Sequence, residues 1–407
     1  MCHPKIGWPE SFIYFQFLAM TKRRFFRYIL CCVLFFAVWE ICARVDDHIE
    51  DGAPLFGNYA ISAMLTHDDY GVVGRPYGHF GKWKLNALGF RGPDIRPDTL
   101  KIICIGASET FGMGESAGME YPRQLERVIN SRQPDLHVEV VNVAYAGQSL
   151  RTFSHRMDNI VDTLSPRIAI LYPSFLGYIN DASIGQPDQL DWIREPKGFH
   201  SRIEEKLFSS IDRMPQWAEN IHFRYHIWRA LRKNRVIVNT IPESHVDQFR
   251  SDLRAVLDGL QARHVRPVLV THATVFGQTV EPKERYMLIA WRRFEPNLAD
   301  DGWLDAERRM NAVIRQEARE RHLPLVEAAN VLSGPQNFID WAHFTNRGAN
   351  IMANLIADKL TAPELDNSLQ LQPLEEAQSL LCAAAHSPAR DMSTFAQTRA
   401  GRARTCR

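Results

Sequence analysis

An excess of charge of either sign is missing from this 407-residue sequence, because 48 Lys and Arg stand against 47 Asp and Glu and the formal net charge is +1. It also lacks a basic stretch with interleaved aromatic residues, the pattern that a nucleic-acid groove requires. Cysteine is scarce, and the seven cysteines show neither the spacing of zinc ligands nor that of a disulfide framework. We therefore expect no nucleic-acid partner, no metal and no cofactor.

Long apolar runs are also missing, with one exception near the N-terminus. Residues 23–43, RRFFRYILCCVLFFAVWEICA, are about as long as a bilayer-spanning helix, with Arg27 and Glu40 near the two ends. Basic residues precede this run and the acidic DDHIED follows it, which predicts a cytoplasmic N-terminus and a periplasmic or external location for the rest of the chain. The absence of an A-x-A cleavage site favours an uncleaved anchor. A buried core helix is the alternative.

The chain divides into five predicted segments. Residues 1–22 form the cytoplasmic N-terminus, in which Met20 directly before TKRR is a more ordinary start than Met1, and residues 23–43 form the anchor. Residues 44–100 are a turn-rich lead-in expected to dock on the main domain, which spans 101–362. Residues 363–407 have the composition of a mostly disordered tail.

Short β-rich apolar runs alternate with amphipathic helical patterns throughout the main domain. Predicted strands KIICIG, HVEVVNV, RIAILYP, PVLVTH and PLVEA are separated by helical segments, and a last helix, NRGANIMANLIADKL, follows the fifth strand. This alternation predicts a three-layer α/β/α sandwich with a five-stranded parallel sheet. A basic, aromatic and helical insertion at about 183–241 interrupts the pattern, and we expect a helical cap there, with a membrane-surface helix as the alternative.

Ligands of open parallel sheets bind beyond the carboxyl ends of the strands, so polar residues just after each strand are candidates for a site. Ser108 follows the first strand in GASETFG, where it can serve as an exposed nucleophile whose amide also faces an oxyanion. Asp340 lies three residues before His343, a spacing that lets the carboxylate accept from the imidazole and leaves the second ring nitrogen for the serine. Gly147 and Asn180 follow the second and third strands and can donate hydrogen bonds to an oxyanion.

These four segments together resemble the conserved blocks of the SGNH, or GDSL-type, hydrolase superfamily, with a flavodoxin-like fold. The resemblance covers about residues 101–360 and implies Ser108 as nucleophile, His343 as general base and acid, and Asp340 as its orienting partner. It also implies an oxyanion hole formed by the Ser108 amide, the Gly147 amide and the Asn180 side chain. The sequence departs from the Gly-Asp-Ser pattern at Ala107, and Thr110 argues against the G-x-S-x-G elbow of α/β-hydrolases.

The resemblance implies a membrane-anchored serine esterase that acts on an ester substrate through an acyl-enzyme, and the substrate class we expect is an O-acylated carbohydrate at the cell surface. One alternative is an O-acyltransferase that passes the acyl group to a glycan hydroxyl. A second alternative is a carbohydrate-binding or scaffold protein without turnover.

Other polar and aromatic residues have ordinary structural interpretations. Ser149 is a rival nucleophile but is more simply a helix cap. His222 and His226 stand four apart without a clear third ligand, and His272 follows the fourth strand near the expected cleft. The aromatic residues of the excursion after that strand are expected to pack on the domain, with a sugar-stacking wall as the alternative: Tyr286, Trp291, Phe294 and Trp303.

Overall fold

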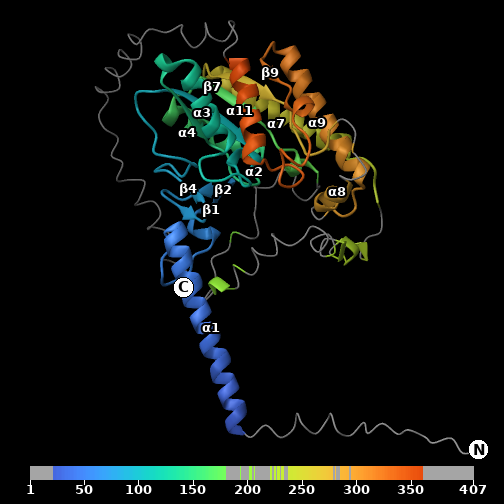
Figure 1. The fold of residues 1–407 in the computed structure, drawn as a ribbon. Helices are drawn as coiled ribbons and strands as arrows, with labels where there is room; N and C mark the ends of the chain where they lie inside the picture. Colours follow the sequence, from blue (N-terminus) through green and yellow to red (C-terminus); the bar gives the residue numbers. More distant parts are fainter. Residues whose placement is uncertain are drawn as a thin grey trace, which may run out of the picture. The chain divides into compact units, whose positions relative to one another are not determined.

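The architecture is that of a parallel α/β domain preceded by one long helix (Figure 1). The computed structural model describes residues 22–179, 237–277, 280, 285–292 and 295–360, together with 193, 201–203, 206, 221, 224–225, 227–229 and 231–232. The predicted tail from 363 and most of the insertion at 183–241 lie outside the described residues.

Five parallel strands form the central sheet in the order β6-β5-β7-β8-β9. This is the flavodoxin-like order, in which the direction of strand addition reverses between β5 and β7. The strands are nearly continuous runs of buried apolar residues, as expected for a sheet covered on both faces. Their bounds are β5 Leu100–Gly106, β6 Val138–Asn142, β7 Ile168–Tyr172, β8 Arg266–Val270 and β9 Leu325–Val326.

Helices cover both faces of this sheet, because right-handed crossovers place them on opposite faces where the direction of strand addition reverses. On one face, α4 packs against α7 and α7 against α9, where Arg254 of α7 forms an ion pair with the buried Glu317 of α9. On the other, Gln124 of α3 accepts a hydrogen bond from Asn350 of α11. The predicted three-layer sandwich is confirmed, with α3 Tyr121–Arg132, α4 Leu150–Leu164, α7 Glu243–Ala262, α9 Asp300–Glu320 and α11 Asn346–Leu360.

Helix α1 (Lys22–Asp51) contains the predicted anchor. It is long and apolar enough to cross a membrane, as signal sequences near an N-terminus also are, and only 6% of its most apolar window is buried. Phe25, Phe26 and Phe35 are among its large side chains that are more than half exposed. The alternative of a buried core helix is therefore wrong.

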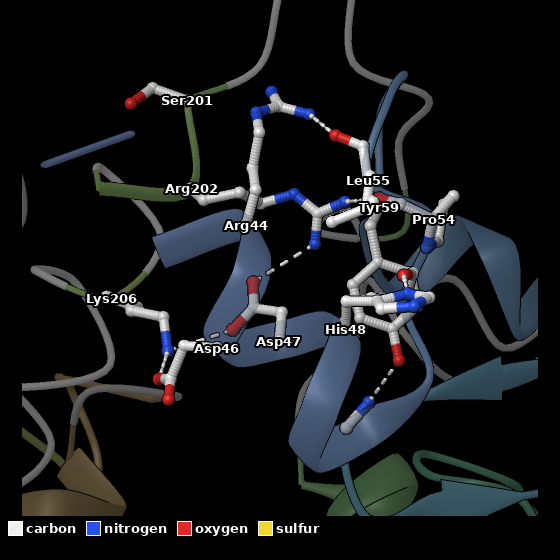
Figure 2. A network of polar contacts seen from close by, with 12 residues as sticks. Arg44, Asp46, Asp47, His48, Pro54, Leu55, Tyr59, Ser201, Arg202 and Lys206 are labelled. Atoms are coloured by element: carbon white, nitrogen blue, oxygen red, sulfur yellow. Dashed lines mark hydrogen bonds and ion pairs between the residues drawn. The ribbon is translucent and has the colours of Figure 1, made fainter. Parts of the chain in front are cut away.

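The helix also continues eight residues beyond Ala43, into the segment expected to be turn-rich. Figure 2 shows the polar contacts around this extension. The fully buried Arg202 guanidinium donates to Asp47 (3.1 Å) and lies 4.7 Å from the centre of the Tyr59 ring, while Lys206 donates to Asp46 (2.6 Å). These charged partners hold the acidic residues in helical geometry.

Hydrogen bonds from distant residues also reach Glu40, just before this extension. The Glu40 carboxylate receives the Arg44 guanidinium at 2.7 Å and the amides of Arg202 and Ile203 at 3.1 and 3.2 Å. Partners more than 150 residues away in the sequence thus stabilise the end of α1, which explains why local turn signals did not predict it.

The rest of the lead-in forms one short helix and two hairpins: η1 Ile61–Ala63, β1 Leu65–Asp68 with β2 Gly71–Gly74, and β3 His79–Phe80 with β4 Trp83–Lys84. Arg156 of α4 donates to the Val72 carbonyl (2.7 Å) and to Asp68 (2.6 Å), and Thr152 donates to the Tyr70 carbonyl (2.8 Å). The segment is joined to the main domain by these contacts.

Candidate active site

The candidate nucleophile lies at the point where the strand order reverses. Ser108 comes two residues after β5 and begins the short helix α2 (Ser108–Phe111), so its N–H has no acceptor within the helix. The turn requires glycine at position 106, because a Cβ there would come within 2.7 Å of the Tyr172 carbonyl oxygen on the neighbouring strand. Ser108 is partly exposed, although the next three residues are buried.

The Asp340–His343 pair predicted from sequence is formed. His343 Nδ1 lies 2.6 Å from Asp340 Oδ2, and Asp340 Oδ1 accepts the amides of Ala342 (2.9 Å) and His343 (2.8 Å). An antiparallel bridge between Phe338 and Phe344 closes the loop just before α11. The carboxylate thereby fixes the imidazole orientation and leaves Nε2 as a buried atom with no hydrogen-bond partner among the described residues.

Charges around His343 favour its protonated form. Burial alone lowers the pKa of this imidazole, but the Asp340 carboxylate beside it, with further contributions from Glu109 and Glu115, raises the pKa to about 9. Burial raises the pKa of Asp340, and the His343 charge together with the two amide hydrogen bonds outweighs that effect and lowers it. At neutral pH the resting pair is therefore an imidazolium and a carboxylate.

The serine segment and the histidine loop are joined directly, although more than 220 residues separate them. A Cβ on Gly114 would lie 2.4 Å from the carbonyl oxygen of Phe344, so only glycine allows this close approach. The Ser116 amide donates to Asn346 Oδ1 (2.9 Å), and Asn346 Nδ2 donates back to Ser116 Oγ (3.0 Å). Gln124 donates to the Asn346 carbonyl (3.1 Å). These contacts bring the nucleophile and base segments to one edge of the sheet.

Arg91 of the lead-in supports the same region. Its guanidinium donates to the carbonyls of Phe111 and Gly112, both at 2.5 Å, and forms an ion pair with Glu120 at 3.0 Å. The Arg91 side chain is 3% exposed. Arg91, a residue of the lead-in, therefore holds the end of α2 in position.

Of the two predicted oxyanion donors outside α2, only Gly147 lies among the described residues. Gly147 is exposed in a turn after β6 with φ of +73°, a conformation that favours glycine. Asn180 lies outside the described residues, as do His222 and His226. The interpretation of Ser149 as a cap is confirmed, because its side chain accepts from the Thr152 amide at the start of α4 (3.2 Å).

Sequence reasoning missed a buried charged chain behind Ser108. Glu109 is 1% exposed and lies 3.3 Å from His272 Nε2, and His272 Nδ1 lies 3.7 Å from Glu307. Burial lowers the pKa of His272, but the hydrogen bond with Glu109 and the charges of both glutamates raise it to about 9. Burial raises the pKa of Glu109, and the His272 hydrogen bond and charge outweigh this and lower it. His272 therefore lies near the site, as expected, and the Glu109 carboxylate links it to Ser108.

Glu115 is the other unexpected acid. It is 1% exposed, and neither carboxyl oxygen has a hydrogen-bond partner among the described residues. Burial raises its pKa to about 8, against the opposing charges of Arg91 and His343. Lys82 nearby donates to the Gly114 carbonyl (3.1 Å), and burial lowers the pKa of this lysine. At neutral pH, Glu115 is mainly an uncharged carboxylic acid.

The aromatic excursion after β8 contributes to the core. Trp291 and Trp303 are both fully buried and stack with ring centres 5.5 Å apart, which supports the packing interpretation over a sugar-binding wall. Among the described residues, no group of three or more His, Cys, Asp or Glu side chains is arranged to hold a metal ion.

Comparisons with known proteins find structural neighbours only. No family model and no curated protein matches the sequence. A catalytic mutant of an acetylxylan esterase from Geobacillus stearothermophilus is 14% identical with a TM-score of 0.39, over 64% of this chain and 94% of that chain. A GDSL-like lipase from Bacteroides thetaiotaomicron is 14% identical with a TM-score of 0.34, over 63% and 86%. A lipase/acylhydrolase from Enterococcus faecalis is 13% identical with a TM-score of 0.39, over 64% and 95%.

One of these neighbours, the GDSL-like lipase, carries the name of the superfamily that the sequence blocks resemble. At such identities and TM-scores the neighbours say nothing about the chemistry of this chain, which depends on its own residues.

Proposed function

We propose that this protein is an SGNH-type serine esterase, anchored to a membrane by α1 with its catalytic domain on the extracytoplasmic side. The observation that carries the proposal is the oriented Asp340–His343 pair. His343 Nε2 has no hydrogen-bond partner in the described part of the chain, and its loop is hydrogen-bonded to the serine segment through Ser116 and Asn346. A carboxylate, an imidazole and a hydroxyl at the switch point of a parallel sheet constitute the parts of an acyl-transfer site.

The proposed reaction begins when neutral His343 takes the proton of Ser108 at Nε2. Ser108 Oγ then bonds to the ester carbonyl carbon, and the Ser108 and Gly147 amides, with the Asn180 side chain, stabilise the oxyanion. His343 returns the proton to the departing alkoxide as the acyl-enzyme forms. A water molecule then loses a proton to His343 and attacks the acyl carbon. The bond to Ser108 Oγ breaks, His343 returns the proton to this oxygen, and the acid is released.

As substrate class we propose O-acylated carbohydrates, because a tethered domain outside the cytoplasm meets the glycans of the cell surface. Release of acetate from acetylated xylan and from acetylated bacterial polysaccharides, compared with hydrolysis of long-chain lipid esters, tests this choice. Hydrolysis of lipid esters alone would replace the carbohydrate assignment without affecting the triad.

Covalent labelling tests the enzyme class directly. A fluorophosphonate probe should modify the full-length protein in detergent, and Ser108→Ala should abolish the labelling. Ser149→Ala is the matched control, because this serine also follows a strand of the sheet but caps α4. Labelling that persists in Ser108→Ala, or is absent from folded wild-type protein, would contradict the proposal.

A further inference from the structure

The Ser108 hydroxyl donates a hydrogen bond to a buried carboxylate. Ser108 Oγ donates to Glu109 Oε2 at 3.3 Å, while the other oxygen of the same carboxylate, Oε1, faces His272 Nε2 at 3.3 Å. The Glu109 carboxylate therefore bridges the nucleophile and a buried imidazole.

This carboxylate is held firmly and in its ionised form. The His272 ring stacks on Tyr172 with ring centres 5.3 Å apart, and its backbone N–H and carbonyl are both bonded to the Asn311 side chain (2.7 and 2.9 Å). Glu307 lies on the far side of the imidazole at 3.7 Å. A buried carboxylate that lacked a cation would take up a proton, so His272 is what preserves the charge of Glu109.

In the proposed triad the Ser108 hydroxyl has two acceptors, the Glu109 carboxylate that it contacts in the structure and His343 Nε2, but only one of them is available at a time. Protonated His343 has a hydrogen on each ring nitrogen and can only donate, whereas the Glu109 carboxylate can only accept. Once His343 has lost its Nε2 proton to solvent, that nitrogen can accept a hydrogen bond. In the proposed triad the Ser108 hydroxyl then turns from Glu109 to His343, and this reorientation breaks no covalent bond.

Resting on the proposed esterase function, we propose that Glu109 holds the Ser108 hydroxyl while His343 is protonated, and that His272 and Glu307 are positioning residues that keep Glu109 ionised. The carboxylate also stabilises the charge of His343, so it delays the activation of the serine to higher pH. The charged and titratable groups facing these residues are Asp340, Glu109 and Glu115 around His343, His272 and His343 around Glu109, and Glu109 and Glu307 around His272.

The test is the pH dependence of Ser108 labelling by the fluorophosphonate probe in the full-length protein, corrected for the Ser108→Ala background. Glu109→Gln removes the charge and keeps the shape, so the acid limb should move to lower pH by about one unit. The ratio of the rate at pH 7 to the rate at pH 10 should therefore rise about tenfold. A merely structural role would lower both rates by the same factor and leave this ratio unchanged.

A double variant and a control variant complete the test. If Glu109→Gln does not fold, the double variant Glu109→Gln/His272→Gln replaces the ion pair by two amides that can bond to each other, and the same rise is expected. Glu139→Gln is the matched control, because this glutamate is 4% exposed but bonded to Arg96 and Thr99 of the lead-in, away from the site. Its ratio should equal that of the wild type.

The outcomes separate the two proposals. Failure of wild-type protein to label at any pH would overturn the esterase assignment and this inference with it. Labelling of the wild type with an unchanged ratio in the Glu109 variants would overturn the inference alone. A wild-type acid limb near pH 6.5 would do so without any variant, because His343 would then be neutral at physiological pH.

Discussion

Replacement of Asp340 by Asn should reduce activity by very different factors at different pH values. Two consequences of the substitution oppose each other. The amide no longer selects the tautomer and orientation of His343, which costs about 10,000-fold in the rate of a Ser-His-Asp site. The amide also removes the charge that contributes most to the raised pKa of His343.

The size of the second effect follows from the pKa itself. A base with a pKa of about 9 is neutral in only about 1% of molecules at pH 7. Because Glu109 and Glu115 keep part of their influence, we expect the pKa to fall by one to two units, which makes about 10–50% of the molecules neutral at pH 7. The net loss should be about 200- to 1,000-fold at pH 7 and about 10,000-fold at pH 10.

The assay is the rate of p-nitrophenyl acetate hydrolysis by the full-length protein in detergent, measured from pH 6 to pH 10. Asp69→Asn, at an exposed carboxylate of the lead-in, serves as the control and should leave the profile unchanged. An equal loss at both pH values would show that Asp340 does not raise the pKa of His343. No loss at either would refute the triad.

Three further perturbations have defined outcomes. The pKa of Glu115 is about 8 in the folded protein and about 4.5 in the unfolded chain, so the stability that its proton contributes falls as pH rises from 4.5 to 8. Glu115→Gln should therefore raise the free energy of unfolding at pH 7 by about 1–3 kcal/mol. An unchanged urea midpoint would count against the burial of Glu115 as an uncharged acid. Arg202→Met removes the buried Arg202–Asp47 contact but leaves Lys206 at 2.9 Å from Asp47, so the cost should be about 1.5–3 kcal/mol. Proteolytic cleavage near residues 201–206 should become faster, and wild-type cleavage kinetics would argue against that contact. Gly114→Ala should separate the histidine loop from the serine segment and lower probe labelling at least tenfold, and full labelling would show that the Phe344 carbonyl yields easily.

The sequence was sufficient for the parts of the fold and site that are encoded locally. Each strand of the main sheet is built mainly from apolar residues, with few polar interruptions such as Glu139 in β6, which is what a sheet covered on both faces requires. The Asp340–His343 bond spans three residues, so its geometry follows from a single turn. The cap formed by Ser149 is similarly local.

What the sequence did not reveal depends on partners distant in the chain. In the sequence, nothing distinguishes Glu109 from an ordinary acidic residue in the first turn of a helix, and only its pairing with His272, 163 residues later, identifies it as a buried ion. No periodic pattern connects two such positions. The extension of α1 beyond Ala43 has the same cause, since its acidic side chains are compensated by Arg202 and Lys206.

The bonds between Ser116 and Asn346 have a consequence for biosynthesis. A chain that enters a membrane by its first helix presents the nucleophile segment early, but the imidazole and the asparagine that secures it are made more than 220 residues later. The general base that we propose, His343, is therefore not held in place until α11 has been translated and docked. An acyl-transferring serine would thus stay chemically silent during insertion, and chains terminated before that helix would be inert whatever their cellular location.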